Sequence, residues 1–269
     1  MTEEIDIILA SHEKPKLLID CVECLYAHTD IPFRLTIVDD STDPVVAIYL
    51  QQIQLTYPNI LLIHSDTPYV HGNQIINIGL RNTKSGIVAY LGNSIRVDPH
   101  WSPMARQLFE MDEKLGIVGF KLLKQAGGIE HAGIYWEPWM PHHMNIGVDS
   151  PAQYYSFIRE YKPDGLIRFA MGFALIMFRR QVFPDGLDEK TYLGFRGYDD
   201  VDICFDAAER GWKIVYCGVG SATHFAGATR HSGDPNYANE CETNRQIFLN
   251  RWGGTEEAKK SVVISKILG

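Results

Sequence analysis

The chain has 269 residues, of which 45% are hydrophobic and 22% charged, so it is long enough to bury the core of one large α/β domain or two small ones. Its formal net charge of −8 argues against a wide electropositive face that would bind nucleic acid, although a local basic groove stays compatible with it. The longest apolar run, Phe169 to Phe178, is ten residues long and contains a glycine, which is too short to span a bilayer.

The N-terminal residues Met1-Thr2-Glu3-Glu4 are acidic and lack a basic segment, so they do not resemble a signal peptide. The five cysteines, an odd number spread along most of the chain, indicate reduced thiols rather than a disulfide framework. Cys21 and Cys24 form a CxxC motif, but no second metal-binding motif follows, and an apolar helical stripe favours core packing. We expect a cytoplasmic protein without a membrane span.

Strand-like and helix-like segments alternate along the first third of the chain. The expected strands are 5–10, 33–38, 60–64 and 87–91, and the expected helices are 16–27, 44–56 and a segment containing Asn73, Asn77 and Gly79. Four such alternations predict an α/β fold whose parallel sheet carries helices on both faces.

Polar residues follow three of these strands: Ser11-His12, Asp39-Asp40 and Gly92-Asn93-Ser94. Ligands of such sheets bind beyond the carboxyl ends of the strands, and an acid after the second strand suits a ribose or the N–H of a uracil base. Asp39 and Asp40 could equally cap the following helix. No GxGxxG follows the first strand, which argues against a dinucleotide-binding dehydrogenase.

The pattern changes after about residue 100. We expect a helix over 101–111, strands and turns over 116–133, a long loop or lid over 135–163, a buried strand over 169–178, a helix to about 210, a strand over 212–216 and a helical tail from 236. Loops as long as 135–163 are usually functional or mobile. Its aromatic residues, among them Trp136, Trp139 and Tyr154, suit either stacking on sugar faces or a core.

The segment 197–204 sets three carboxylates, Asp199, Asp200 and Asp202, beside the core-forming residues Val201 and Phe205. If a helix begins here, Asp199 and Asp200 stand at its N-terminus, where the helix dipole favours negative charge and a carboxylate is well placed to accept a proton. Simple helix capping explains the same composition.

Taken together, the segments resemble family-2 glycosyltransferases, which have the GT-A fold and use nucleotide-sugar donors. The matching stretches run in the family's order: 7–15, 38–43, 77–79, 119–123 with 129–133, 197–204, Thr223-His224 with Gly227, and 244–253. The resemblance implies a GT-A (Rossmann-like) fold with a mixed, mainly parallel central sheet flanked by helices. It implies a single domain over 1–269, with a nucleotide-sugar half (1–98), an acceptor-binding and catalytic half (99–230) and a helical tail (231–269).

The resemblance also implies an inverting transfer of a sugar from a nucleoside diphosphate, most commonly UDP, to an acceptor hydroxyl. Asp200 matches the general base, and Asp199 would orient the acceptor or the donor sugar. The nucleotide would lie on Ala10, Ser11, His12, Asp39, Asp40, Asn93 and Ser94. His131 and Trp136 would face the acceptor, a saccharide or another hydroxyl compound, and a turn role for His131 is equally compatible.

One departure concerns the metal. The family usually carries a DxD-like triplet that holds a divalent cation on the diphosphate, whereas this chain has Gly92-Asn93-Ser94, which offers only neutral oxygen ligands. Either Mn²⁺ or Mg²⁺ is held weakly, with His224 at the position of the family's metal-contacting histidine, or a basic side chain neutralises the diphosphate. Arg96, Arg230 and His231 are candidates for that role, and solvated surface charge explains each of them as well.

Two other functions compete. The chain could be a glycosyltransferase-like nucleotide-binding or regulatory module that lost catalysis with its metal triplet, although Asp199, Asp200 and His224 argue against this. A nucleotidyltransferase would need a basic glycine-rich phosphate loop near the first strand, which the sequence lacks.

Overall fold

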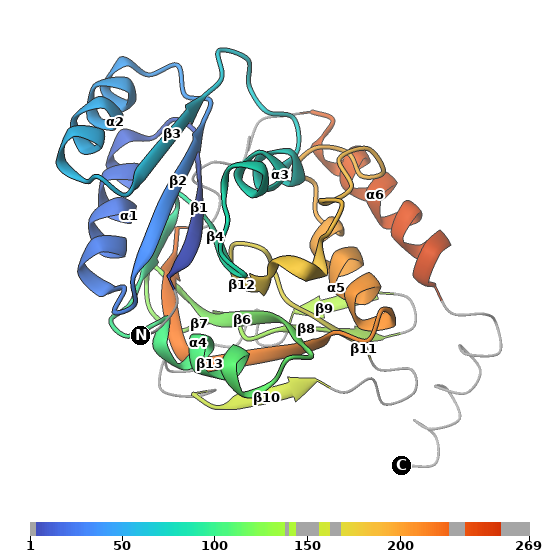
Figure 1. Ribbon diagram of the computed structural model, residues 1–269. Helices are drawn as coiled ribbons and strands as arrows, with labels where there is room; N and C mark the ends of the chain where they lie inside the picture. The colour runs from blue at the N-terminus through green and yellow to red at the C-terminus, as the bar shows by residue number, and fades with distance from the viewer. Residues whose placement is uncertain (1–3, 138–139, 144–155, 162–167, 226–234, 254–269) are drawn as a thin grey trace, which may run out of the picture.

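The first part of the chain alternates strand and helix as predicted (Figure 1). The computed structural model describes residues 4–137, 140–143, 156–161, 168–225 and 235–253. The elements up to residue 92 are β1 (Ile5–Ser11), α1 (Pro15–His28), β2 (Phe33–Asp39), α2 (Pro44–Thr56), β3 (Ile60–His64), α3 (Gly72–Asn82) and β4 (Ile87–Gly92).

Alternating side chains of β1 build two cores, one on each face of the sheet. Ile5, Ile7 and Leu9 pack with the buried residues of α1 and α2, whereas Ile8 packs with those of α3. Successive residues of a strand point to opposite faces, so the apolar run of β1 is buried twice. This packing holds β3, β2, β1 and β4 side by side and parallel, with Ser11 opposite Asp39 and Ala10 opposite Gly92.

The second part of the chain extends the same sheet and adds a small one. Its elements are β5 (Ile95–Val97), α4 (Pro103–Met111), β6 (Leu115–Lys124), β7 (Ile129–His131), β8 (Ile134–Glu137), β9 (Met140–His143), β10 (Ile158–Tyr161), β11 (Arg168–Ala170), β12 (Leu175–Arg179), the 3₁₀ helix η1 (Arg180–Val182), α5 (Asp199–Glu209), β13 (Lys213–His224) and α6 (Tyr237–Trp252). The main sheet runs β10-β13-β6-β12-β4-β1-β2-β3, with β5 on β13 and β7 on β6. Strand β12 is antiparallel to both β4 and β6, so the sheet is mixed and mainly parallel as predicted. The small sheet runs β11-β8-β9.

The single buried strand expected over 169–178 is wrong, because the segment is divided between the two sheets as β11 and β12. At the break, Met171 N–H lies 3.4 Å from Cys204 Sγ, and Gly172 N–H donates to His131 Nε2 at 3.4 Å. These partners draw the backbone out of the strand, because every buried N–H needs an acceptor. The loop expected over 135–163 is also partly wrong, since its described residues include β8, β9 and β10.

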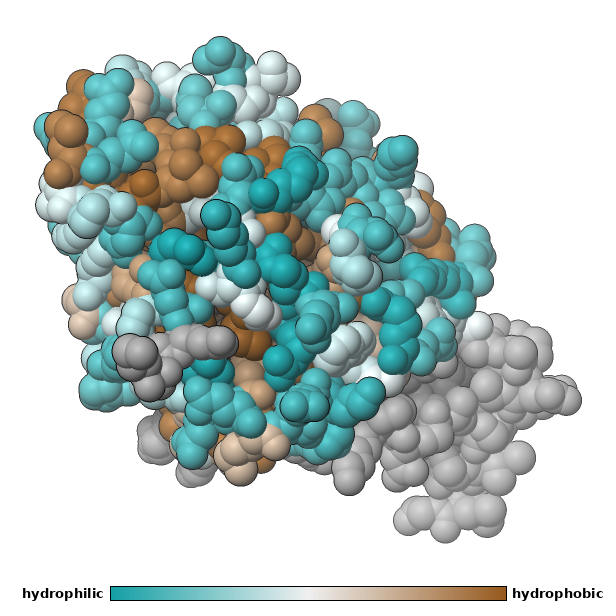
Figure 2. Space-filling model, viewed as in Figure 1, coloured by the Kyte–Doolittle hydropathy of each residue, from teal (hydrophilic) through white to brown (hydrophobic). Residues whose placement is uncertain are grey.

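Strands from both predicted halves of the chain form the main sheet, and the division at 98/99 and 230/231 stays a prediction. In the described part of the chain, no helix is long and apolar enough to cross a membrane. Apolar surface gathers over α2 and β3 (Figure 2), where Val45, Ile48, Leu55 and Leu61 are exposed.

Candidate active site at the carboxyl ends of the strands

The carboxyl ends of β1, β2 and β4 meet at one edge of the main sheet, where the polar residues predicted to bind a nucleotide lie. Asp40 N–H donates to the Ser11 carbonyl at 3.2 Å, and Asn93 N–H donates to the Ala10 carbonyl at 2.9 Å. Because the strands are parallel and in register, these contacts hold the three loops together. The hydroxyl of Ser11 is buried here and has no hydrogen-bond partner among the described residues, which leaves it able to bind a ligand.

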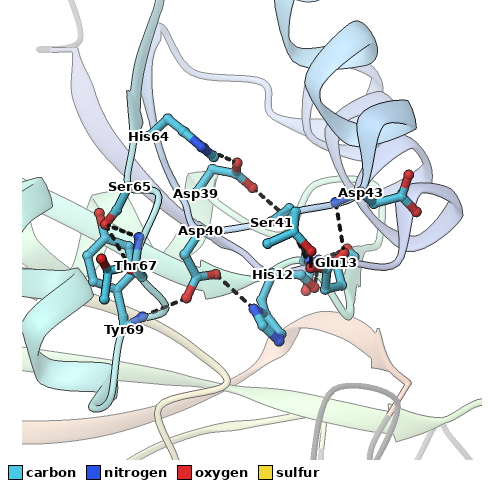
Figure 3. A network of polar contacts seen from close by, with 12 residues as sticks. His12, Glu13, Asp39, Asp40, Ser41, Asp43, His64, Ser65, Thr67 and Tyr69 are labelled. Atoms are coloured by element: carbon cyan, nitrogen blue, oxygen red, sulfur yellow. Dashed lines mark hydrogen bonds and ion pairs between the residues drawn. The ribbon is translucent and has the colours of Figure 1, made fainter.

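Asp40 is buried and central to this edge (Figure 3). His12 Nδ1 lies 2.8 Å from Asp40 Oδ1, and Tyr69 N–H donates to Asp40 Oδ2 at 2.7 Å. The hydrogen bond to Asp40 raises the pKa of His12, against the opposing effect of burial. The two residues therefore form a pair in which the histidine donates to the carboxylate.

Neither Asp39 nor Asp40 caps α2, because Asp43 does so by accepting from Val45 N–H at 2.8 Å. Asp39 Oδ1 accepts from the Ser41 hydroxyl at 2.7 Å, and Asp39 Oδ2 lies 2.8 Å from His64 Nδ1. The two strand-end acids are thus held by side chains of the site, which removes the capping interpretation for both.

Glu13 is a structural residue of this edge that the sequence did not single out. Its Oε1 accepts from both the backbone N–H and the hydroxyl of Thr42 at 2.8 Å, and its Oε2 accepts from Asp43 N–H at 3.2 Å (Figure 3). These donors lower the pKa of Glu13, with the Thr42 N–H the largest cause. Glu13 and Lys14 have φ of 48° and 57°, so left-handed backbone directs the loop after β1 toward β2.

The triplet Gly92-Asn93-Ser94 lies between this edge and the end of β13. The Asn93 side-chain amide donates to the carbonyls of His12 and Glu13 at 3.2 and 3.1 Å, so its nitrogen holds the β1 loop. On the other side, Phe225 N–H donates to the Ser94 carbonyl at 2.9 Å, and His224 pairs with Ile95. The structure therefore brings His224 to the triplet, as the metal hypothesis requires.

The basic residues considered for the diphosphate are placed differently. Arg96 forms an ion pair with Asp20 of α1, and its guanidinium lies 3.8 Å from the centroid of the Phe225 ring. Its charge is already balanced by that carboxylate, which disfavours the neutralising role. Arg230 and His231 lie outside the described residues, as do Trp139, Tyr154 and the side chain of Trp136.

The residues that could hold a metal are few. Across the described ranges, no group of three or more histidine, cysteine, aspartate or glutamate side chains is placed to bind one. Two such side chains do meet, since His224 Nδ1 lies 3.0 Å from Glu130 Oε1, and the backbone of His224 pairs with that of Ile95, next to the triplet. The other oxygen of this carboxylate, Glu130 Oε2, is buried and has no hydrogen-bond partner among the described residues. A cation bound here would therefore meet an available oxygen. The donor set fits a cation that takes its other ligands from a bound diphosphate.

The acidic cluster begins α5, and a tight turn presents it. Gly197 and Tyr198 both have left-handed backbone, with φ of 77° and 73°, and the helix starts at Asp199. Asn244 of α6, fully buried, accepts from Leu193 N–H at 2.7 Å and donates to the carbonyls of Leu193 and Gly197 at 3.1 Å. Helix α6 thereby holds both ends of the segment 193–197 that precedes the two acids.

Asp202, the third acid, bonds away from the other two. Arg251 donates to its Oδ2 at 2.7 Å, and Trp252 donates to its Oδ1. Burial raises the pKa of Asp202, and these two donors oppose that effect. The geometry agrees with the expectation that Asp202 is a structural acid of the first helical turn.

Asp200 and His131 flank Gly172, which stands in the break between β11 and β12. A Cβ built on Gly172 would lie 3.7 Å from Asp200 Oδ2, 3.6 Å from His131 Cε1 and 3.9 Å from His131 Nδ1. His131 Nε2 accepts from the N–H groups of Gly133 and Gly172 at 3.3 and 3.4 Å. Since backbone N–H groups can only donate, Nε2 is the acceptor in both bonds. The predicted base and the predicted acceptor-side histidine therefore face one small space.

Asp199 has a strongly perturbed carboxyl group. Burial, followed by the negative charge of Asp200, raises its pKa from the ordinary 3.8 to about 7. The charge of Asp199 in turn adds to the effect of burial in raising the pKa of Tyr90 on β4. A carboxyl group with a strongly raised pKa beside a second carboxylate is typical of sites that move protons.

Replacing Asp199 with asparagine is expected to stabilise the fold, and more so as pH rises. The folded pKa is above the unfolded one, so the stability linked to protonated Asp199 is fully present below about pH 4, falls as pH rises, and is lost above about pH 7. One pKa unit corresponds to about 1.4 kcal/mol, so the shift from 3.8 to about 7 gives an expected gain of up to about 4 kcal/mol at pH 8 and little at pH 4. Urea unfolding across this range measures it, with Asp66→Asn on the exposed surface as control. A gain that does not change with pH would contradict the assignment.

The chain is similar to known glycosyltransferases in sequence and in fold. The family model described as Glycosyl transferase family 2 matches residues 6–184. The chain is 24% identical over 248 residues to the O-antigen biosynthesis protein RfbC of Myxococcus xanthus, an alignment that covers 86% of this chain and 18% of RfbC. The chain thus spans about a fifth of the length of that relative.

Solved structures resemble the chain over most of its length. GalNAc-T7 with UDP, GalNAc and Mn²⁺ matches with a TM-score of 0.65 at 15% identity, over 82% of this chain and 43% of that one. Residues 1–349 of S. aureus TarS in complex with UDP-GlcNAc match with a TM-score of 0.61 at 14% identity, over 99% of this chain and 72% of that one. Likeness at these identities concerns the fold alone, and it confirms the predicted GT-A fold.

Proposed function

Because this chain belongs to glycosyl transferase family 2, we propose that it transfers a sugar from a UDP-linked donor to an acceptor hydroxyl with inversion at the anomeric carbon. The observation that carries the proposal is the placement of Asp200 beside Gly172 and His131, next to the edge where β1, β2 and β4 end. A carboxylate at a helix N-terminus suits a general base.

The strand ends would bind the nucleotide. Asp40 would accept from the base, and Asp39 with its His64 partner would support the ribose, while Ala10, Ser11 and His12 form the floor. The partnerless Ser11 hydroxyl supports this, because a bound ligand would supply the hydrogen bond that the described residues do not. UDP is the proposed nucleotide because both GalNAc-T7 and TarS were solved with UDP compounds.

The proposed reaction is a single displacement. The acceptor hydroxyl, in the space bounded by Gly172, loses its proton to Asp200 as its oxygen attacks the anomeric carbon. The bond to the nucleoside diphosphate breaks on the opposite face, and the diphosphate leaves with the bonding electron pair. His131, whose Nε2 accepts from two backbone N–H groups, lies beside that space, and Asp199 orients the acceptor or the donor sugar. Positioning of this kind accounts for much of the rate in enzymes that join two substrates.

Mn²⁺ or Mg²⁺, held through His224, would offset the negative charge that develops on the departing diphosphate. The acceptor is proposed to be a saccharide, because the similar RfbC protein is named for O-antigen biosynthesis.

Nucleotide binding tests the proposal directly. We expect UDP to raise the melting temperature of the protein more than GDP or dTDP does. A ligand present at 100 times its Kd stabilises the folded protein by about 2.7 kcal/mol. Asp40→Asn should weaken UDP by roughly tenfold or more, since a hydrogen bond to a charged group contributes about 1.5–3 kcal/mol, whereas Asp30→Asn, in an exposed pair with His100, should not. No stabilisation by any nucleoside diphosphate, with or without Mn²⁺, would overturn the proposal. Binding of UDP without turnover of any UDP-sugar would favour the alternative of a non-catalytic binding module.

A further inference from the structure

Glu130 and His224 meet beside the triplet that lacks the expected carboxylate. Glu130 is the middle residue of β7, which folds back on the end of β6, and His224 is the last residue of β13. The Lys124 end of β6 pairs with His224, so the sheet fixes the two elements relative to each other. His224 Nδ1 lies 3.0 Å from Glu130 Oε1, and both side chains are mostly buried.

The second oxygen of Glu130 makes this pair unusual. Glu130 Oε2 is buried and has no hydrogen-bond partner among the residues that the structure describes. A buried carboxylate oxygen left unsatisfied costs about 1–3 kcal/mol or more. A group from outside the protein that carries positive charge would remove this cost, and a metal cation is the simplest such group.

We propose that Glu130 supplies the carboxylate ligand of a divalent cation at this site, in place of the acid missing from Gly92-Asn93-Ser94, with His224 as the second protein ligand. Adjacent ligands in an octahedral shell with bonds of about 2.1 Å lie roughly 3 Å apart. In this structure the 3.0 Å contact between His224 Nδ1 and Glu130 Oε1 is a hydrogen bond, and a cation that replaced its proton would meet both atoms at about that spacing. The inference rests on the proposed function, because the diphosphate of the donor completes the shell.

The ligand atoms at this site favour one metal over another. An imidazole nitrogen together with carboxylate and phosphate oxygens suits Mn²⁺ better than Mg²⁺, which prefers oxygen ligands and keeps its waters. The nearby Asn93 contributes no charge, and its amide nitrogen is occupied by the carbonyls of His12 and Glu13. The negative charge that attracts the cation therefore comes from Glu130.

The test is a titration of Mn²⁺, followed by electron paramagnetic resonance, into the whole protein saturated with UDP. We expect Glu130→Gln to weaken the binding of Mn²⁺ by tenfold or more. In the absence of metal, this variant should bind UDP with the affinity of the wild type. The matched control is Glu113→Gln, the same substitution at an exposed position after α4, which should leave Mn²⁺ affinity unchanged. Wild-type Mn²⁺ affinity in Glu130→Gln would overturn the proposal.

A double variant separates a ligand from a residue that only orients His224. If Glu130 is itself a ligand, Glu130→Gln lowers Mn²⁺ affinity further in a His224→Ala background. No further loss there would mean that Glu130 acts only through His224, and would overturn the ligand assignment. If the wild type binds UDP equally well with and without Mn²⁺, the proposed metal site alone is overturned. If it binds no UDP under any condition, the proposed function is overturned as well.

Discussion

Asp200→Asn is expected to lower the rate of sugar transfer by about 10² to 10⁴, the usual contribution of a positioned general base. Asparagine keeps the shape of the side chain and can still accept from Val201 N–H, as Asp200 Oδ1 does at 2.9 Å, but it cannot take the proton of the acceptor. The loss should therefore fall on kcat, with the KM of the donor little changed. Release of UDP from UDP-sugars measures this, with and without a panel of saccharide acceptors.

The matched control lies on the same helix. Asp206→Asn removes a carboxylate of α5 that pairs with Arg210 and Arg251 at the surface, and such exposed pairs contribute about 0–1 kcal/mol. This variant should keep wild-type turnover. Near-normal transfer by Asp200→Asn would remove Asp200 from the base role, and turnover lost equally in both variants would indicate a general defect of α5.

Asn244→Ala is expected to destabilise the protein by about 3 kcal/mol, because three hydrogen bonds to backbone groups of Leu193 and Gly197 are lost and each contributes about 0.5–1.5 kcal/mol. Asn244→Asp keeps the acceptor for Leu193 N–H but buries a carboxylate against the carbonyls of Leu193 and Gly197, so its loss should be at least as large. Urea unfolding measures both.

Asn250→Ala on the exposed side of the same helix is the control and should change the free energy of unfolding by no more than about 0.5 kcal/mol. We also expect Asn244→Ala to slow transfer more than it weakens UDP, since the segment 193–197 leads into Asp199 and Asp200 rather than into the strand ends. A variant as stable as the wild type would show that α6 does not hold this turn.

Local signals in the sequence predicted the first part of the fold well. The helix over 44–56 has the bounds of α2, because Asp43 followed by Pro44 is a strong helix start. The break at Gly172 was not predictable, since the partners of Met171 and Gly172 are Cys204 and His131, more than thirty residues away in each case. Periodicity detects an apolar segment but not the tertiary acceptors that interrupt it.

The candidate site shows the same contrast. Its strand-end acids could be predicted because parallel strands bring their carboxyl ends to one edge. The role of Glu13 depends on its left-handed backbone and on Thr42, which is 29 residues away in the sequence. Glu130 and His224, which form the other pair, are 94 positions apart. Neither contact leaves a pattern in the local sequence, so both required the structure.

Strand β7 constrains how this protein can change in evolution or by engineering. Two adjacent residues of this strand contact different groups. Glu130 contacts His224, and His131 lies beside Gly172. The hairpin before it turns through Gly127 and Gly128, both with positive φ, and its pairing with β6 shifts register between Leu122 and Leu123. One residue inserted into or deleted from this turn would exchange the two faces and displace both side chains at once. Length changes should therefore be tolerated far better in other surface loops than in this short hairpin.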